Sequence, residues 1–475
     1  MLRTSLLLIL CVLLCHAQTY DTVIAGGRVM DPESGLDAVR FVGISDGKVR
    51  VVSQAPLSGR ITLQAQGLVV APGFIDLHWH GKEPAMGRYQ VMDGVTSALE
   101  LEIGVAGIDE WYAARAGKSI VNHGASIGHP PIRMALMKDP GAFLPAGAAA
   151  HRAATDAEIE EMKKRIEEGL RRGAPAVGFG IAYTQAASYW EILEMFRAAA
   201  KFKASAHVHI RGASSVAGAS ADREQGLSEV IAAAAITGAP LHVVHINSSG
   251  QQSAGRMLHI ISEARLRGID VTTEAYPYAA GATRIESALF DAWMDRLPSD
   301  YQMLQWGATG ERLTRESFLK YRRLGGTVIM HTNTEERVRM AILSPLTIIA
   351  SDGYDFLEGS GHPRSSGTYS RVLARYVREE GALPLMDALK KMTLMPAQRL
   401  AVRVPAMRDK GRIRAGADAD LTIFDPARIR DQSTYEKPDA MSAGVVHVLV
   451  NGTAVVRDGK LLEGIYPGKA IRAPV

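Results

Sequence analysis

The stretch Gly73-Phe74-Ile75-Asp76-Leu77-His78-Trp79-His80 is an apolar run that ends in two histidines separated by one residue. On a β-strand, side chains at positions i and i+2 leave the same face, so the imidazoles of His78 and His80 can meet at one cation. A lone His-x-His pair is common, however, and does not by itself define a metal site. Further ligands have to come from elsewhere in the chain.

Three other apolar runs also end on a residue that can bind a metal. Residues 206–209, 241–245 and 346–352 end on His209, His245 and Asp352. In (β/α)8 barrel enzymes, parallel strands deliver the active-site residues from their C-terminal ends. The four runs together predict a metal-dependent enzyme of the α/β class, built on a (β/α)8 TIM-type barrel.

Residues 1–17 predict a secretory signal peptide. Arg3 precedes an apolar run from Leu6 to Leu14, which is too short to span a bilayer, and small residues follow it. We therefore expect a secreted or periplasmic protein with no membrane span in the mature chain. Both cysteines of the chain, Cys11 and Cys15, lie in this segment. The mature chain is thus expected to contain neither a disulfide nor a thiolate ligand.

The length and charge of the chain limit its class. Its 475 residues can hold a barrel of roughly 250 residues or more together with a smaller domain. The formal net charge is +4 and is spread without long basic runs, which gives no indication of a nucleic-acid partner. The expected partner is a small-molecule substrate, and the sequence does not predict the oligomeric state.

Short strand-like segments broken by Gly, Asp and Pro occupy residues 18–70 and return at residues 405–475. Two β-rich ends around a strand–helix alternation predict one small β-sandwich formed by both chain ends, with the barrel at 71–404. The expected barrel strands are 73–80, 96–102, 125–134, 176–183, 204–211, 241–247, 270–278 and 347–353. A ninth run, 326–331, is placed in an insertion before the last strand, where residues 279–323 can cover the pocket.

The predicted metal ligands are His78, His80, Glu102, His209, His245 and Asp352. Imidazole and carboxylate donors suit one or two divalent ions, with zinc preferred. Two dications repel each other, so a two-metal site needs a bridging anion. Residues 176–183 contain no lysine that could be carboxylated for this purpose. The run 96–102 offers two glutamates, and Glu102 is preferred over Glu100 because it lies nearer the C-terminal end of the strand.

Asp352 is also the predicted catalytic residue. Its carboxylate can take a proton from an attacking water and return it to the leaving nitrogen. His207 and His242 precede His209 and His245 in their strands, so we expect them to pack inside the barrel and not to bind metal.

With these motifs in place, the chain resembles the amidohydrolase superfamily and, within it, the N-acyl-D-amino-acid deacylases, often called D-aminoacylases. The resemblance rests on residues 72–80, 94–96, 209–211, 275–281, 351–353, 362–364, 416–420 and 424–426. It implies metal binding by the same four histidines and Asp352. It also implies that Tyr183, Tyr278 and Arg364 face the substrate, with the Arg364 guanidinium binding a substrate carboxylate.

The chain departs from the pattern of this family at two informative positions. The family's bridging ligand is a cysteine, and an ungapped alignment places Ile103 there, so Glu102 or Glu100 must replace it. The residue two positions after His245 is often lysine in relatives and is Asn247 here. Because that ammonium group is missing, a substrate amino acid with an acidic side chain is less expected.

The preferred interpretation is a secreted metal-dependent amidohydrolase that hydrolyses the amide bond of N-acyl amino acids, of D configuration by resemblance, or of small dipeptides. A cyclic amidohydrolase of the dihydroorotase or hydantoinase kind is the alternative enzyme, disfavoured by the missing lysine at 176–183. A non-catalytic barrel scaffold is the third interpretation, and the complete ligand set disfavours it.

Overall fold

The computed structural model describes residues 19–212, 220–356 and 360–475. The signal peptide expected at residues 1–17 lies outside these ranges. Within them, the helices are all too short or too polar to cross a membrane.

Eight parallel strands form the central sheet in the order β16-β12-β11-β10-β9-β8-β7-β6. Their bounds are β6 (Phe74–Asp76), β7 (Val95–Val105), β8 (Asn122–Gly128), β9 (Ala176–Gly180), β10 (Ser205–His209), β11 (Leu241–Val243), β12 (Val271–Ala275) and β16 (Thr347–Ile349). Each lies in one of the expected runs or overlaps it. The expected (β/α)8 barrel is therefore confirmed.

Contacts between the first and last strands complete the barrel. The Asp76 carboxylate on β6 accepts hydrogen bonds from the backbone N–H and the hydroxyl of Ser351, just after β16. A few residues further on, the His80 N–H donates to the Gly353 carbonyl at 2.7 Å. These bonds fix the ends of β6 and β16 side by side.

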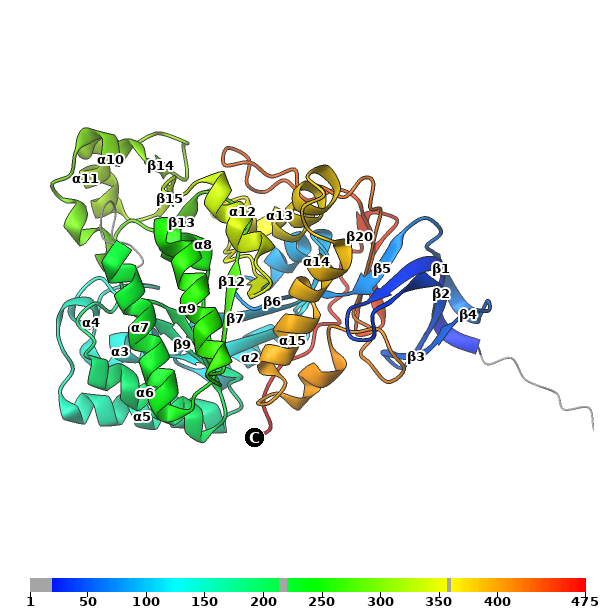
Figure 1. The fold of residues 1–475 in the computed structure, drawn as a ribbon, viewed down its shortest axis with the longest axis horizontal. Coiled ribbons are helices and arrows are strands. Elements are labelled where there is room, and N and C mark those ends of the chain that lie inside the picture. Colours follow the sequence, from blue (N-terminus) through cyan, green and yellow to red (C-terminus); the bar gives the residue numbers. More distant parts are fainter. Residues whose placement is uncertain (1–18, 213–219, 357–359) are drawn as a thin grey trace, which may run out of the picture.

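Helices alternate with the strands and surround the barrel (Figure 1). Their bounds are α1 (Gly87–Met92), α2 (Ile108–Arg115), α3 (His129–Met137), α4 (Ala148–His151), α5 (Asp156–Arg171), α6 (Tyr189–Lys201), α7 (Ser220–Thr237), α8 (Ile246–Gly250), α9 (Ala254–Leu266), α12 (Glu335–Leu343), α13 (Arg364–Arg371), α14 (Leu385–Met392) and α15 (Leu394–Leu400). Helix α5 begins with a capping box between Thr155 and Glu158 and buries one apolar face.

Two of the expected strands end earlier than predicted and run into helices. In residues 241–247, β11 ends at Val243 and α8 begins at Ile246. Residues 125–134 do not form a single strand, because β8 ends at Gly128 and α3 begins at His129. Pro130 and Pro131 explain the change. Proline lacks an N–H but has the φ of a helix, so it is accommodated in the first turn of a helix and not in a central strand.

The insertion before the last strand forms a small unit of its own over one end of the barrel (Figure 1). It contains a three-stranded antiparallel sheet of β13 (Gly281–Arg284), β15 (Thr327–Met330) and β14 (Leu304–Trp306). Two short helices, α10 (Pro298–Gln302) and α11 (Arg315–Leu324), complete it. The ninth strand-like run, 326–331, belongs to this insertion as expected.

Both chain ends build the second domain, which lies at the far end of the molecule from the insertion (Figure 1). Its nine strands form one sheet in the order β20-β19-β18-β17-β5-β1-β2-β3, with β4 also paired to β1. The bounds are β1 (Thr19–Asp31), β2 (Leu36–Ser45), β3 (Lys48–Ser53), β4 (Ser58–Gln64), β5 (Val69–Pro72), β17 (Leu421–Phe424), β18 (Val445–Val450), β19 (Thr453–Arg457) and β20 (Lys460–Leu461). Strand β5 pairs with β17, which joins the two ends of the chain.

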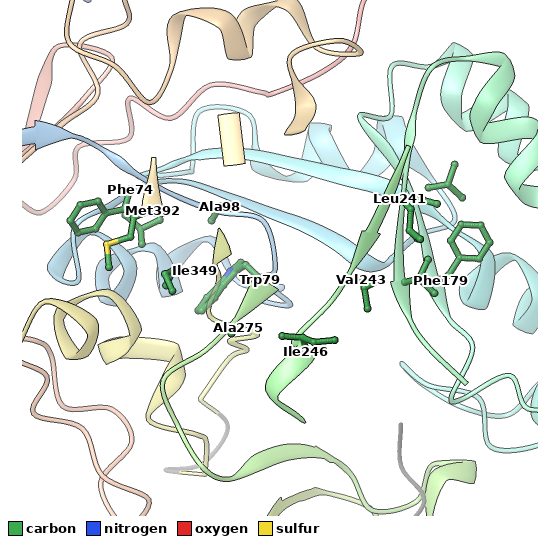
Figure 2. Close-up of a cluster of buried hydrophobic side chains, with 14 of the residues drawn as sticks. Phe74, Trp79, Ala98, Phe179, Leu241, Val243, Ile246, Ala275, Ile349 and Met392 are labelled. Carbon is green, nitrogen blue, oxygen red and sulfur yellow. The ribbon is translucent and has the colours of Figure 1, made fainter. Parts of the chain in front are cut away.

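The largest buried cluster lies between the barrel strands and the helices (Figure 2). Strand residues such as Phe179 and Val208 share this cluster with helix residues such as Phe196, whose ring lies 5.1 Å from that of Phe179. Because successive side chains of a strand alternate, His207 and His209 then face away from Val208, toward the inside of the barrel. The apolar pattern of the strands thus determines which side chains reach the site.

Candidate active site

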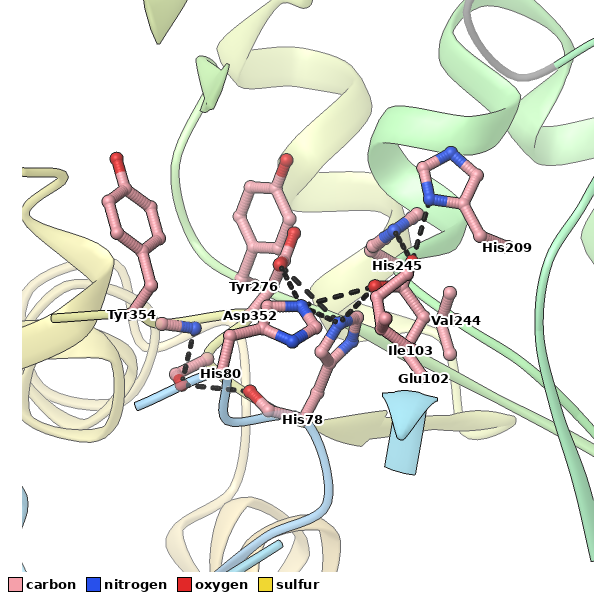
Figure 3. Close-up of polar contacts among 12 residues, drawn as sticks. His78, His80, Glu102, Ile103, His209, Val244, His245, Tyr276, Asp352 and Tyr354 are labelled. Carbon is pink, nitrogen blue, oxygen red and sulfur yellow. Dashed lines mark hydrogen bonds and ion pairs between the residues drawn. The ribbon is translucent and has the colours of Figure 1, made fainter. Parts of the chain in front are cut away.

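Six side chains converge at the C-terminal ends of the barrel strands (Figure 3). The Nε2 atoms of His78 and His80 lie 3.0 Å apart. Both lie 3.4 Å from the Asp352 Oδ1 atom. His209, at the end of β10, and His245, just after the adjacent strand β11, face them across the barrel, and Glu102 lies between the two pairs. All six residues predicted as metal ligands are therefore brought together.

Glu102 occupies the centre of this cluster with its two oxygens facing different partners. Its Oε2 lies 3.2 Å from His78 Nε2 and 3.1 Å from His80 Nε2. Its Oε1 lies 2.7 Å from His209 Nδ1 and 3.2 Å from His245 Nε2. This position, between two pairs of imidazoles, is the one that a bridging carboxylate requires.

Glu100 points elsewhere. Its Oε2 lies 2.6 Å from His80 Nδ1, on the far side of that ring. Its Oε1 accepts the backbone N–H groups of Ile103 and Gly104, both at 3.2 Å. With both oxygens engaged away from the other histidines, Glu100 does not occupy the bridging position.

Two of the converging residues adopt backbone conformations that are rare for side-chain-bearing residues. His245 has φ 31° and Asp352 has φ 52°, both in the left-handed region. Such conformations concentrate at functional sites, where the surrounding structure enforces them. Here they turn both side chains inward just after β11 and β16 end.

Charge in the cluster favours a bound cation. Burial raises the pKa of Asp352, but the Arg364 guanidinium and the His78 imidazole outweigh it and lower that pKa to about 2. Burial also opposes ionisation of Glu102, yet the imidazoles of His78 and His209 hold the pKa of its carboxyl well below the ordinary value. The carboxylates in turn overcome the effect of burial on His78 and raise its pKa well above 6.5. The ionised carboxylates thus stabilise positive charge among the imidazoles.

The donor geometry also fits a small divalent ion. Donors held about 2.0–2.1 Å from a tetrahedral zinc are about 3.3 Å from one another. The separations around His78, His80 and Asp352, 3.0 to 3.4 Å, are of this size. The same three residues, and separately His78, Glu102 and His245, place ligand atoms within 4.8 Å of one another. These side chains could therefore hold one or two ions.

A cavity of about 420 Å³ opens directly onto this cluster. Residues of the insertion line it, including Ala282, Thr283 and Leu289, as expected for a segment that covers the pocket. Apolar side chains dominate one part of the wall, namely Ile103, Phe143, Leu144, Leu289 and Met330. A mostly apolar cavity with a few polar groups at its end is typical of a small-molecule site.

Arg364 and Tyr183 line this cavity, as predicted for residues that face a substrate. Arg364 is buried at the start of α13, and its Nη1 lies 2.8 Å from Asp352 Oδ2. The Arg364 Nε has no hydrogen-bond partner among the described residues. The Tyr183 ring lies 5.0 Å from that of His209, and burial raises the pKa of its hydroxyl, which therefore keeps its proton.

Tyr278 is placed differently from the prediction and does not line the cavity. Strand β12 ends at Ala275, and beyond it the Tyr278 hydroxyl lies 3.4 Å from the Asp431 carboxylate. The guanidinium of Arg371 covers its ring at 4.8 Å. The C-terminal segment therefore engages this side chain, and Tyr276 takes the place at the cavity wall.

Asn247 also has a structural role instead of a place in the cavity wall. It is fully buried, and its side chain donates to the Tyr276 carbonyl and accepts from the Tyr276 N–H. It therefore holds the backbone of a wall residue.

Glu274 on β12 is the residue of this region that the sequence reasoning did not identify. It is 1% exposed and its Oε1 lies 2.5 Å from His78 Nδ1. The sequence does contain a feature that points to Glu274, since it is the one acidic residue of the buried strand Val271–Ala275. The argument that applies to Glu100 and Glu102, that a buried carboxylate needs a partner, applies to Glu274 as well.

Comparison with known proteins agrees with this site. Residues 131–456 match the amidohydrolase family. The chain is 30% identical to N-acyl-D-glutamate deacylase of Alcaligenes xylosoxydans xylosoxydans over 92% of this chain and 93% of that protein. It is 27% identical to the D-aminoacylase of the same organism, over 96% and 98%. The structure of N-acyl-D-glutamate deacylase from Bordetella bronchiseptica superposes with a TM-score of 0.81 at 25% identity, over 96% of this chain and 100% of that one.

A match of this extent defines the class of the protein. The chain belongs to the amidohydrolase family. It is a hydrolase that acts on carbon–nitrogen bonds other than peptide bonds, and its similarity to the N-acyl-D-amino-acid deacylases extends over nearly the whole chain.

Proposed function

We propose that this protein is a metal-dependent deacylase that hydrolyses the amide bond of N-acyl-D-amino acids or of small dipeptides. The observation that carries the proposal is the convergence of four imidazoles and two carboxylates at the end of a 420 Å³ cavity that also contains a buried arginine. Relatives of known activity along nearly the full chain support the D-amino-acid class.

Zinc is the proposed metal, as one or two ions held by His78, His80, His209, His245, Asp352 and Glu102. The donor set contains nitrogen and oxygen atoms only, which suits this ion. The related deacylase from Bordetella bronchiseptica was solved with zinc and a phosphonate inhibitor that mimics the tetrahedral intermediate of its reaction. When bound, such an ion activates water and polarises the substrate carbonyl.

The remaining chemistry falls to the side chains around the cavity. Arg364 lines the cavity and binds the substrate carboxylate there, beside the contacts of its Nη1 with Asp352 and of its Nη2 with the Ala282 carbonyl. This contact positions the amide near Asp352, whose carboxylate takes a proton from the attacking water and delivers it to the leaving nitrogen. The Tyr183 hydroxyl is placed to donate a hydrogen bond to the substrate.

The cavity wall favours neutral or apolar substrate groups. Its apolar part, around Phe143 and Met330, offers a surface for such groups, although the Lys82 ammonium lies 4.9 Å from the centre of the Phe143 ring. Arg284, another cationic group of the wall, is paired with Glu286 at 2.8 Å. The proposed preference for neutral side chains therefore rests on this apolar surface and not on Asn247, which does not line the cavity.

We also propose that the protein is exported. The support is the basic and apolar sequence of residues 1–17 and the absence of cysteine from residues 18–475. The mass of the exported chain tests this, and a mature protein that retains residues 1–17 would contradict it.

Asp352→Asn should keep the fold and remove most of the turnover. An amide cannot carry the proton, and general acid–base groups typically contribute ~10²–10⁴-fold in rate. The measurement is kcat with N-acetyl-D-amino acids together with metal content. Activity close to that of the wild type, with metal bound, would refute the role of Asp352.

Glu102→Gln should reduce bound metal and activity together, because a neutral amide bridges two cations poorly. Glu100→Gln is the matched control. It should keep the wild-type stoichiometry at saturating metal, since Glu100 contacts only one histidine of the cluster. Elemental analysis gives the metal content. If neither variant differs from the wild type, neither glutamate bridges.

Arg364→Met should raise KM sharply for N-acetyl-D-amino acids, and their methyl esters should be poor substrates of the wild type. Both changes remove one side of a charged, bidentate pair that positions the amide. Arg284→Met, at the other arginine of the wall, is the control and should have a smaller effect. Equal kcat/KM for acids and esters would argue against carboxylate binding by Arg364.

A further inference from the structure

A fully buried histidine lies two positions before Arg364 and connects it to the start of the insertion. The Nδ1 atom of His362 lies 3.1 Å from the backbone N–H of Arg364, and its Nε2 atom lies 3.0 Å from the Ala280 carbonyl. A backbone N–H only donates and a carbonyl only accepts, so Nδ1 carries the lone pair and Nε2 carries the hydrogen. Burial and the Arg364 guanidinium hold the pKa of His362 well below 6.5. The imidazole is therefore neutral and has one fixed tautomer.

The same two segments meet a second time through the Arg364 side chain. Its Nη2 donates to the carbonyl of Ala282, two residues after Ala280, at 3.2 Å. Together with the two bonds of His362, this contact closes a ring between the start of the insertion and the start of α13. The Arg364 Nη1 lies 2.8 Å from Asp352 Oδ2. The ring therefore fixes the direction of the guanidinium at the cavity wall.

A tyrosine from the second domain supports this ring. Tyr435 belongs to residues 425–444, which connect β17 to β18. Its hydroxyl accepts the backbone N–H of Ala280 at 3.3 Å, and its ring lies 5.2 Å from that of His362. Ala280 is 1% exposed, so both of its backbone polar groups need partners. The side chains of His362 and Tyr435 supply one partner each.

The same connection also holds α13, the helix that begins with Arg364. The Ser433 hydroxyl donates to the Pro363 carbonyl at 3.1 Å. In the opposite direction, the Ser366 hydroxyl donates to the Pro438 carbonyl at 2.7 Å. The first turn of α13 is thus attached to the second domain, and the backbone of Arg364 cannot shift without breaking these contacts.

We propose that His362 and Tyr435 are positioning residues that hold the Arg364 guanidinium in the direction in which it meets the substrate carboxylate. This inference rests on the role proposed for Arg364 above, and it adds the side chains through which the second domain contributes to substrate binding. Neither His362 nor Tyr435 lines the cavity, so both act through Arg364. A bidentate contact between a planar guanidinium and a carboxylate depends on the direction of the guanidinium plane.

The test compares N-acetyl-D-amino acids with their methyl esters. The acid-to-ester ratio, which is kcat/KM for the acid divided by kcat/KM for its ester, measures the contact with the carboxylate. His362→Ala should lower this ratio by about 10–100-fold, mainly through the KM of the acid, because a displaced guanidinium no longer matches the carboxylate. Partial unfolding would lower turnover of both substrates equally and leave the ratio unchanged. Tyr435→Phe, which loses only the hydroxyl, should lower the ratio less.

Two conservative variants separate the two ends of the His362 bridge. His362→Asn keeps an acceptor near the position of Nδ1 for the Arg364 N–H. His362→Gln keeps a donor near the position of Nε2 for the Ala280 carbonyl. Each variant retains one of the two bonds, so each should keep a higher acid-to-ester ratio than His362→Ala.

His129→Gln is the matched control. His129 is also fully buried and does not line the cavity, and its Nε2 lies 2.7 Å from Glu191. This variant should keep the wild-type acid-to-ester ratio, whatever its melting temperature. An equal fall of the ratio in His129→Gln and His362→Ala would overturn the inference.

A crystal structure of His362→Ala gives a readout that does not depend on activity. The guanidinium of Arg364 should move away from the Ala282 carbonyl and the Asp352 carboxylate. In an Arg364→Met background, His362→Ala should cause no further fall of the acid-to-ester ratio. An unmoved guanidinium, or a wild-type ratio in His362→Ala, would overturn the inference. Equal kcat/KM for acids and esters in the wild-type protein would instead refute the carboxylate contact of the proposed function.

Discussion

The structure depends on the compensation of one buried charge, the carboxylate of Glu102. Placing an ionised carboxylate inside an apolar barrel costs several kcal/mol unless partners satisfy both oxygens. Here four imidazoles from three segments supply those partners, at 2.7 to 3.2 Å. Each imidazole reaches Glu102 only if its strand holds its register in the barrel. The cluster therefore constrains the register of β7, β10 and β11 and the course of the chain after β6.

The contact between the first and last strands adds the remaining carboxylate. Asp76 accepts two hydrogen bonds from Ser351, and the residue that follows Ser351 is Asp352. Asp352 in turn pairs with Arg364 at the start of α13. The hydrogen bonds between Asp76 and Ser351 therefore do two things. They close the barrel between β6 and β16, and they place Asp352 beside His78.

The sequence predicted those parts of the site that follow from strand periodicity. His78, His80, His209 and His245 end apolar runs, and ends of parallel strands meet at one face of a barrel. The prediction that Tyr278 faces the substrate is wrong because Tyr278 follows the end of β12, where the alternation of strand side chains no longer applies. The direction of its side chain depends instead on a contact with Asp431 of the C-terminal segment. Strand 125–134 was extended too far because the start of α3 depends on local proline chemistry.

The roles of Glu274 and Glu100 could not be predicted from the sequence for a different reason. Whether a buried carboxylate binds a metal or supports a ligand depends on which nitrogen of an imidazole it meets. That is a matter of ring orientation, which no spacing in the sequence encodes. Glu100 and Glu102 share a strand and a face, yet one meets His80 at Nδ1 and the other at Nε2.

The offset between Glu102 and the position of the family's cysteine has a physical explanation in β7. Neighbouring residues of a regular strand point to opposite faces, so a ligand could not move by one position and stay in the site. The pairing of β7 with β8, however, shifts its register between Glu100 and Val105, and Gly104 has φ 69°. Through this irregularity both Glu102 and Ile103 line the cavity. The longer glutamate can therefore serve from position 102 while Ile103 contributes to the apolar wall. Its two oxygens face the two histidine pairs separately, which a single sulfur atom at position 103 could not do.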